Sequence, residues 1–468
     1  MKRNVPSPIA AWSLATLLLM LVLAGRALAA GPRIKILHSF QGGDGAYPLG
    51  SLIFDAAGNL YGTAPEGAAP AHNGVVFQLQ PPAHNESHWR ETTIATFAGS
   101  DGANPYAALI SDRSGNLYGT TDFGGAFNCG TVFQLTPPAT PGAAWTKTVL
   151  YDFPGGRGGS SPYGGLAMDR KGNLYGTTFW GGDDCQEFGL PCGIVFELRR
   201  PTAKGKGWIE SVIYRFKSVR DGYWPFAGLV IDENGNLYGT TIDGGEYGTS
   251  RSAWRSAHNF VIPTPFIPIM DGPDGTVFEL TPPPDGTGEW TKTILHSFGQ
   301  PYDGANPYSA LIRDRHGNLY GTTYFGGTST NCGFVGESCG TVFRLSPPHK
   351  KGGSWTETIL SSFASGSSRG AGPYAGVAFD RYGNLYGTTN FGGTTISGIC
   401  NYGCGVVFKL TPAGKGEAWT ETVLHRFVNS SDGAYPVAGV VLCPKGNLWG
   451  TTELGGASGL GTTFEIIP

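Results

Sequence analysis

Charged residues are scarce in this 468-residue chain. Asp, Glu, Lys and Arg make up 14% of it, against about 25% in an ordinary globular protein. With a formal net charge of −3, the chain has no basic surface of the kind that binds nucleic acid, and we expect no such partner. No long window shows an apolar period of 3.6 residues, which excludes helical solenoids.

Glycine and aromatic residues are abundant instead. The chain contains 75 glycines, and aromatic side chains make up 12% of it. The glycines do not fall at every third position, which excludes a collagen helix. The sequence is also too apolar to be disordered. Such a composition is not typical of a mostly helical protein.

Residues 1–29 have the organisation of a secretory signal peptide. A positively charged start precedes the mostly apolar residues 10–24 and the small-residue site Ala27-Leu28-Ala29. The apolar run has about 15 residues, short of the ~20 that span a bilayer, which favours cleavage before Ala30 over a retained anchor. No later run is long enough to cross a membrane. We therefore expect a secreted or periplasmic protein with no membrane span after cleavage.

The hexapeptide Gly-Asn-Leu-Tyr/Trp-Gly-Thr recurs through the rest of the chain, and its spacing sets the fold. Neighbouring copies begin 57 to 82 residues apart. The seven copies start at Gly58, Gly115, Gly172, Gly235, Gly317, Gly383 and Gly446.

Each repeat contains four segments that read as strands. In the second repeat these segments lie within residues 107–110, 116–120, 131–135 and 145–150, and turn residues bound each of them. Four strands in about 57 residues fit a blade of a β-propeller. A β-helix is the alternative, but its coils are shorter and more even in length. The sequence therefore predicts an all-β, seven-bladed β-propeller with four antiparallel strands per blade.

The ring is expected to close through its first strand. If each repeat is taken to begin at the proline before its first strand, as at Pro105 in the second repeat, the last repeat lacks a fourth strand. Residues 34–40 then remain unassigned at the start of the chain. We predict that residues 34–40 form the outer strand of the last blade and pair with residues 462–466. Residues 30–468 would then form one propeller, with a long insertion at residues 243–274.

The repeated pattern Gly-Asn-Leu-Tyr-Gly-Thr-Thr-x-x-Gly-Gly, followed by Gly-Thr-Val-Phe-x-Leu-Thr-Pro-Pro, resembles the Gloeo/Verruco tandem repeat of secreted bacterial proteins. The resemblance covers residues 34–468. It implies no established reaction. Some members of that family carry a surface-sorting anchor, which we do not expect here because the chain stops directly after its last strand.

Strand order divides the loops between two faces. Loops between the second and third strands, and loops between blades, share one face, which we call the Gly-Gly face after its repeated segment. The Pro-Pro stretches lie on the opposite face, the Pro-Pro face. Loop lengths vary more on the Gly-Gly face, and variable loops on a rigid ring are where recognition is concentrated.

Eight cysteines fit an oxidising compartment. Six of them form close pairs, each within one loop of the Gly-Gly face, and the pairs belong to three different blades. That separation favours loop disulfides over a zinc ribbon. The expected disulfides are Cys185–Cys192, Cys332–Cys339 and Cys400–Cys404, with Cys129 and Cys443 as buried free thiols.

Acidic residues and histidines recur at fixed places in the repeats. One set of aspartates opens Asp-Gly turns between blades, and another precedes the Gly-Asn motif. Both sets are expected to form turns rather than calcium sites. His38, His296 and His425 share one outer-strand position on different blades, so they cannot converge on one ion. We expect no metal, no cofactor and no catalytic residue.

Aromatic residues of the Gly-Gly face are the candidate ligand-binding groups. Aromatic rings stack on sugars or apolar peptide side chains, although these rings could equally pack between blades. The insertion adds further candidates and is expected to cover part of the channel mouth. The candidate residues are Phe123, Trp180, Trp224, Trp254, Arg255, Phe325 and Phe391.

These observations favour a secreted, non-catalytic binding or structural protein. It would be a monomer that presents its Gly-Gly face to an extracellular glycan or protein. The alternative is a secreted hydrolase or lyase acting on a carbohydrate or lactone, which rests on analogy between propellers alone.

Overall fold

The computed structural model describes residues 31–68, 71–84, 86, 88–140, 142–185, 189–203, 205–247, 274–284, 286–329, 339–350, 352–364, 369–412, 414, 418–443 and 446–468. The expected signal peptide lies outside these residues, as does most of the expected insertion. No helix in the described part is both long and apolar enough to cross a membrane.

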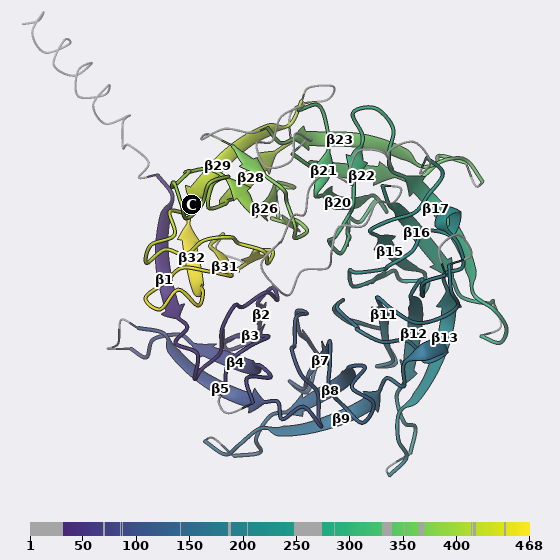
Figure 1. Ribbon diagram of the computed structural model, residues 1–468, viewed down its shortest axis with the longest axis horizontal. Helices are drawn as coiled ribbons and strands as arrows, with labels where there is room; N and C mark the ends of the chain where they lie inside the picture. Colours follow the sequence, from purple (N-terminus) through teal and green to yellow (C-terminus); the bar gives the residue numbers. More distant parts are fainter. Residues whose placement is uncertain are drawn as a thin grey trace, which may run out of the picture.

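Seven four-stranded antiparallel sheets are arranged in a ring, which confirms the predicted seven-bladed propeller (Figure 1). Blade one contains β2 (Ile53–Phe54), β3 (Leu60–Ala64), β4 (Val75–Gln80) and β5 (Arg90–Thr96). Blade two contains β6 (Ile110–Ser111), β7 (Leu117–Thr121), β8 (Thr131–Thr136) and β9 (Thr146–Asp152). Blade three contains β10 (Ala167–Met168), β11 (Leu174–Thr178), β12 (Ile194–Arg199) and β13 (Ile209–Arg215).

The other four blades repeat this order. Blade four contains β14 (Val230–Ile231), β15 (Leu237–Thr241), β16 (Thr276–Thr281) and β17 (Thr291–Ser297). Blade five contains β19 (Ile312–Arg313), β20 (Leu319–Thr323), β22 (Thr341–Ser346) and β23 (Thr356–Ser362). Blade six contains β25 (Ala378–Phe379), β26 (Leu385–Thr389), β28 (Val406–Thr411) and β29 (Thr420–Arg426). Blade seven contains β30 (Val441–Leu442), β31 (Leu448–Thr452), β32 (Thr462–Ile467) and β1 (Arg33–Ser39).

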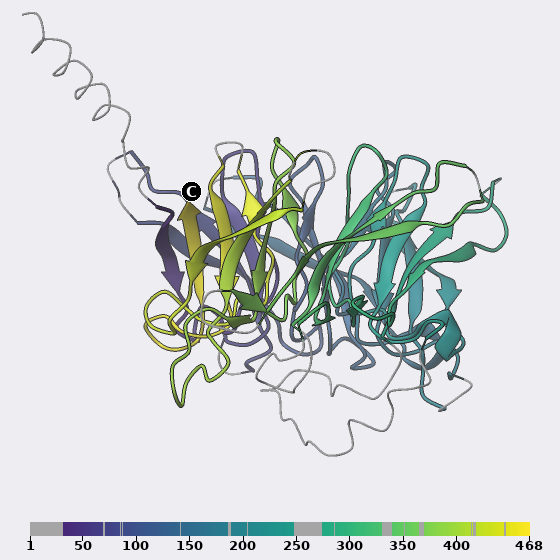
Figure 2. The ribbon, with the colours of Figure 1, turned by 90° about the horizontal axis from the view of Figure 1, so that it is seen from above.

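Short elements lie in the loops of the Gly-Gly face. Two small ladders pair β18 (Gly304–Ala305) with β21 (Phe325–Gly326) and β24 (Gly370–Ala371) with β27 (Phe391–Gly392). Two 3-10 turns, η1 (Gly156–Gly158) and η2 (Val219–Asp221), lie between blades. Hairpin loops project on both sides of the ring when the blades are viewed edge-on (Figure 2).

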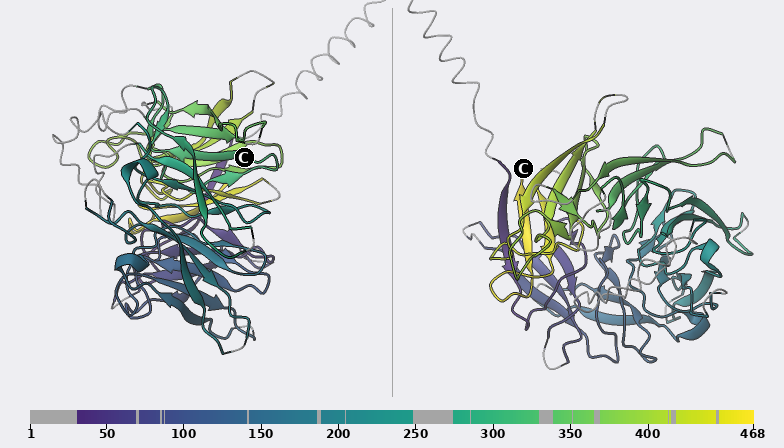
Figure 3. Two further views of the ribbon diagram at one scale, coloured as in Figure 1. Left: turned by 90° about the vertical axis from the view of Figure 1, so that its right-hand side faces the viewer. Right: turned by 45° about the horizontal axis from the view of Figure 1, so that its top comes forward.

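The first strand closes the ring as predicted. β1 pairs antiparallel with β32, from Arg33 opposite Ile467 to Ser39 opposite Thr462. The outermost strand of blade seven therefore comes from the other end of the chain, and β1 lies beside the C-terminal strand in the tilted view (Figure 3, right). This pairing covers the free edge of β32 and joins the two ends of the chain.

In six of the seven blades an Asp precedes the Gly-Asn motif and organises the inner hairpin; Cys443 takes its place in blade seven. Asp55 accepts hydrogen bonds from the backbone N–H groups of Ala57 and Asn59, both at 2.9 Å. Its other oxygen accepts from the Asn59 amide at 2.7 Å and the Tyr61 hydroxyl at 2.9 Å. These bonds confirm the predicted turn role. The same arrangement recurs at Asp112, Asp169, Asp232, Asp314 and Asp380.

The glycine of Leu-Tyr-Gly-Thr makes room for a phenylalanine of the neighbouring strand. Gly239 is paired with Phe278 in the ladder between β15 and β16. A Cβ atom at Gly239 would lie 2.6 Å from Cζ of that ring. The equivalent glycine of every other blade meets its own phenylalanine at 2.4 to 2.7 Å.

The same phenylalanines hold neighbouring blades together. The residue that follows each outer strand by one position is a buried Phe, and its ring packs against the third-strand Phe of the next blade. All seven pairs have centroids 5.1 to 5.4 Å apart, with planes inclined by 60° to 71°, the arrangement that aromatic rings favour. The pairs are Phe40–Phe77, Phe97–Phe133, Phe153–Phe196, Phe216–Phe278, Phe298–Phe343, Phe363–Phe408 and Phe427–Phe464.

We expect Gly239→Ala to lower the free energy of unfolding by about 2–3 kcal/mol, because the added methyl group displaces the Phe278 ring from its seam. Urea denaturation measures the change. Gly207→Ala is the matched control, since an added Cβ there meets no atom within 4 Å. Adding Phe278→Leu should cost less in the Gly239→Ala background than in the wild type. Strictly additive effects of the two substitutions would contradict the steric argument.

Candidate functional site

The aromatic residues predicted to bind a ligand are not equally exposed. Phe123 is 43% exposed, and Trp180 and Phe391 are half-buried. Trp224 and Phe325 are only 2% and 4% exposed. For these two residues, packing between blades is therefore the interpretation that the structure supports. The remaining candidates, Trp254 and Arg255, lie outside the described residues.

Contacts between blades account for the burial of Trp224. Its indole N–H donates to the carbonyl oxygen of Pro191 at 3.1 Å. Its ring stacks on Phe179 with centroids 5.3 Å apart and packs edge-on against Trp180. Trp224 thus belongs to the core between blades three and four, and it presents little surface to a ligand.

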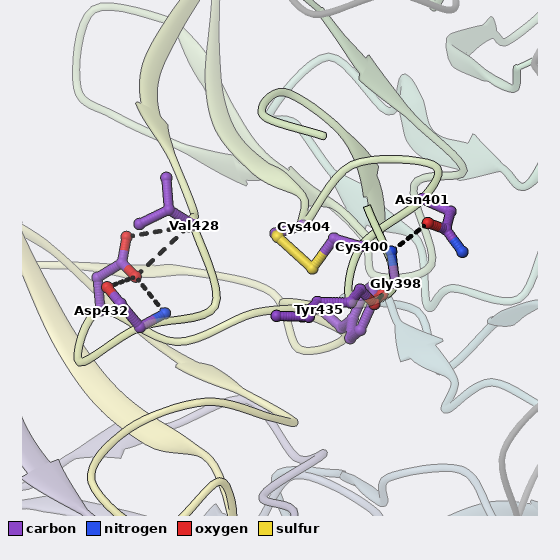
Figure 4. Close-up of a disulfide and its surroundings, with 9 residues drawn as sticks. Gly398, Cys400, Asn401, Cys404, Val428, Asp432 and Tyr435 are labelled. Atoms are coloured by element: carbon purple, nitrogen blue, oxygen red, sulfur yellow. Dashed lines mark hydrogen bonds between the residues drawn. A yellow bond between two sulfur atoms is a disulfide. The ribbon is translucent and has the colours of Figure 1, made fainter. Parts of the chain in front are cut away.

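Two of the expected disulfides are present, namely Cys185–Cys192 and Cys400–Cys404. Figure 4 shows the second one, in a loop where the Gly398 N–H donates to Asn401. Cys339 is also disulfide-bonded, whereas Cys332 lies outside the described residues.

The two remaining cysteines differ from the prediction in their burial. Cys129 is a free thiol, as expected. Both Cys129 and Cys443 are half-buried rather than buried.

The central channel is lined mainly by the residues that lead into the first strand of each of the seven blades. Its cavity of about 360 Å³ has walls of glycine, alanine, serine and short apolar residues. Small residues are required because the inner strands converge: a Cβ at Gly228 would lie 2.6 Å from the carbonyl oxygen of Gly165 in the neighbouring blade. Buried threonines join adjacent blades here, as when the Thr63 hydroxyl donates to the Ala107 carbonyl at 3.0 Å.

An incomplete row of aromatic rings lines this channel. The residue after the proline that leads into each first strand is aromatic in blades two to six and aliphatic in blades seven and one, where Val437 and Leu49 stand. Neighbouring rings in the row have centroids 5.0 to 5.6 Å apart. The five rings are half-buried, so part of each faces the cavity; they are Tyr106, Tyr163, Phe226, Tyr308 and Tyr374.

Acidic residues lie beside this row in blades seven, one and two, on the side where the aromatic row is broken. The residue directly after the Thr-Thr pair is Glu453 in blade seven and Asp122 in blade two, and these are 8% and 1% exposed. Within the described residues, neither oxygen of Asp122 has a hydrogen-bond partner. Glu66 of blade one is half-buried and acts on Tyr106 together with both of these acids.

Burial is the main cause of the shifted pKa values of these acidic residues and of Tyr106. It raises the pKa of Asp122 to about 7, although the nearby hydroxyls of Ser161 and Tyr163 partly offset the shift. Burial also raises the pKa of Glu453 to about 7. The pKa of Tyr106 is raised well above its usual range, first by burial and then by the charges of the three acids. The tyrosine hydroxyls therefore stay protonated and can donate hydrogen bonds.

The arrangement can bind a small polar molecule. Half-buried rings provide apolar faces, tyrosine hydroxyls donate and accept, and two buried carboxyl groups accept hydrogen bonds. We call Tyr106, Tyr163, Asp122 and Glu453, with the adjoining channel wall, the mouth site. Sequence reasoning missed Asp122 and Glu453. The available signal was that the residue after Thr-Thr changes from repeat to repeat, while the strand core around it stays constant.

Two of the outer-strand histidines lie next to acidic residues that the sequence did not predict as neighbours. The sequence places His38 and His296 far apart, which is correct, but each one lies next to two carboxyl groups at a seam between blades. Their neighbours are Asp44 and Glu91 for the first, and Asp303 and Glu357 for the second. The inter-blade aspartates keep their predicted turn role as well, as when Asp44 accepts from the Gln41 N–H at 2.8 Å.

Fold and site together define a seven-bladed propeller with a channel that is asymmetric in its chemistry. A sequence model of the Gloeobacter/Verrucomicrobia repeat matches residues 27–252 and 270–464. The chain therefore belongs to this repeat family, as its hexapeptide pattern predicted. No curated protein matches the sequence.

Solved structures share the fold at low sequence identity. A proposed oxidoreductase (glucose dehydrogenase) of Thermus thermophilus is 16% identical with a TM-score of 0.39, and the match covers 77% of this chain and 94% of that one. A protein of unknown function from Dyadobacter fermentans is 12% identical with a TM-score of 0.42, covering 93% and 98%. PorZ, a surface component of the type-IX secretion system of Porphyromonas gingivalis, is 13% identical with a TM-score of 0.45, covering 92% and 47%. At these scores none of the three informs the function.

We expect Glu453→Gln to stabilise the protein at pH 8 and to leave it nearly unchanged at pH 4.5. The folded chain holds the Glu453 proton more tightly than the unfolded chain, so unfolding releases a proton between pH 4.5 and about 7. The free energy of unfolding therefore falls as the pH rises through that window, by up to about 3 kcal/mol from this group. Urea denaturation across the pH range measures this difference.

The exposed Glu246 provides the control, because Glu246→Gln removes a carboxyl group that is not buried. It should shift stability equally at both pH values. A Glu453→Gln effect that is the same at pH 4.5 and pH 8 would show that burial does not perturb this group.

Proposed function

We propose that this protein is a secreted, non-catalytic binding protein that recognises an extracellular glycan at the mouth site on its Gly-Gly face. The observation that carries the proposal is the row of half-buried aromatic rings that lines the channel, together with the buried carboxyl groups of Asp122 and Glu453, whose charges act on Tyr106. Sugars offer apolar ring faces for stacking and hydroxyl groups for donation to carboxylates, so both halves of the site would be used.

The buried carboxyl group of Asp122 supports a polar ligand in particular. The Ser161 and Tyr163 hydroxyls lie near it without a hydrogen bond of ordinary geometry, so a ligand hydroxyl could donate to its oxygens. The 360 Å³ of the channel cavity lies in the usual range for small-ligand sites, so one end of a glycan would fit.

A secreted or periplasmic location supports the same proposal. The disulfides in the Gly-Gly-face loops are typical of an oxidising compartment, where structural disulfides persist. The aromatic rim outside the channel, with Phe123 and Phe127 exposed, would add contacts to a longer glycan.

A carbohydrate hydrolase is the second candidate. Asp122 and Glu453 both have a pKa raised to about 7, and a pair of perturbed carboxyl groups is the usual equipment of glycoside hydrolysis. Among the described residues the mouth site contains no histidine, so the two carboxyl groups would have to supply both the acid and the base.

A glycan array probed with the chain that begins at Ala30 tests the proposal. Tyr106→Leu should weaken binding of the selected glycan roughly tenfold or more, about 1.4 kcal/mol, because it removes a stacking face. The variant should fold, since blade one carries Leu49 at the equivalent position. Asp122→Asn should weaken binding as well, through the loss of a charged acceptor.

Tyr382→Ser is the control, because it removes an exposed aromatic ring from the opposite, Pro-Pro face. Failure of the wild type to bind any glycan, or equal binding by Tyr106→Leu and Asp122→Asn, would reject the mouth site. Shortening of the bound glycan on incubation would instead identify the hydrolase.

A further inference from the structure

The outer parts of the seven blade seams carry a repeated polar arrangement. Three parts of the chain meet at each seam: the outer strand of one blade, the turn after that strand, and the outer strand of the next blade. The residue that the next outer strand contributes is Glu or Lys in six blades and Ile34 in blade seven. The residues that this side chain meets at the seam determine whether the local charge is balanced.

In five of the seven seams, the outer part contains a single carboxyl group. Lys147 pairs with Asp101 at 2.6 Å and Lys292 with Asp221 at 2.9 Å. In the remaining three seams the carboxyl group meets the outer-strand residue of the preceding blade, which gives the pairs Tyr151 with Glu210, Ser361 with Glu421 and His425 with Asp432.

Two seams instead bring two carboxyl groups to one histidine. Between blades four and five, Nε2 of His296 lies 3.1 Å from Oδ2 of Asp303 and 3.7 Å from Oε1 of Glu357. Between blades seven and one, Nε2 of His38 lies 2.8 Å from Oδ2 of Asp44, and Glu91 completes the group. In each group the three potential ligand atoms lie within 4.8 Å of one another.

We propose that these two groups are divalent metal sites of the zinc class, each formed by one imidazole nitrogen and two carboxylate oxygens. A tetrahedral Zn²⁺ with bonds of about 2.0–2.1 Å holds its ligand atoms about 3.4 Å apart, so small side-chain movements suffice. Three protein ligands leave a fourth position for water.

Charge and hydrogen bonding both point to a cation. Burial and the neighbouring aspartate raise the pKa of Glu357 and of Glu91, so without an ion each group holds a proton that a divalent cation would displace. Oε1 of Glu357 is buried and has no hydrogen-bond partner among the described residues, so it is available to a ligand. Rings at Phe40 and Phe298 pack edge-on against the two histidines and fix their orientation.

The site between blades four and five also has an entrance. A surface groove of about 560 Å³ reaches His296 and is lined in part by Glu246, Tyr247 and Gln300. An ion bound at either site would bridge two blades and so reinforce the ring from outside the aromatic seam.

Metal analysis of the EDTA-treated chain after equilibration with ZnCl₂ tests this proposal. The wild type should bind two zinc ions at these sites, Glu357→Gln and Glu91→Gln should each lose one, and the double variant should lose both. Zinc should raise the melting temperature of the wild type and not that of the double variant, because only the native state provides the sites. Circular dichroism checks that the variants fold, and His38→Gln with His296→Gln provides a second route to the same loss.

His425→Ala is the matched control, because its seam has the His–Asp pair with Ile34 in the third place. It should bind as much zinc as the wild type. No zinc bound by the wild type would overturn the proposal, and the carboxyl groups would then share protons instead. Unchanged zinc in the folded double variant would also overturn it and would place the ions on other histidines.

Discussion

The edge-to-face phenylalanine pair at each blade seam is the contact on which the rest of the ring depends. One ring directly follows the outer strand of a blade, and the other lies in the third strand of the next blade, at all seven seams. The third-strand ring covers a second-strand glycine that cannot carry a Cβ. One packing requirement thus fixes two residues of the repeat and links three strands, which explains why Gly-Thr and Val-Phe recur together.

This seam leaves other positions free to vary. The residue after the proline that leads into the first strand and the residue after Thr-Thr lie inward of it, and they form the mouth site. The outer-strand residues at the seams lie outward of it, and they carry the ion pairs and the two histidine groups. Because the phenylalanine pairs already hold the blades together, neither set has to supply a core. Chemistry can therefore differ from blade to blade while the ring keeps its geometry.

The fold could be predicted from the sequence because each blade is a local unit. Strand periodicity, the Asp-Gly-Asn hairpin and the closing strand are all encoded within about 60 residues or at the two ends of the chain. The burial of Trp224 could not be predicted in this way, since it depends on Phe179 and Pro191 of the preceding blade. The histidine groups were missed for the same reason, because His38 and Glu91 are 53 positions apart and meet only at a seam.

Asymmetry in a repeated structure is therefore the informative property of this chain. A ring of seven identical units would place seven copies of each side chain too far apart to act together. Here, acids replace apolar residues after Thr-Thr in blades seven and two, and the aromatic row is interrupted in blades seven and one, so the departures gather on one side of the channel. A ligand bound in the channel would thus meet carboxyl groups only from blades seven, one and two, which would favour a single orientation within a nearly sevenfold scaffold.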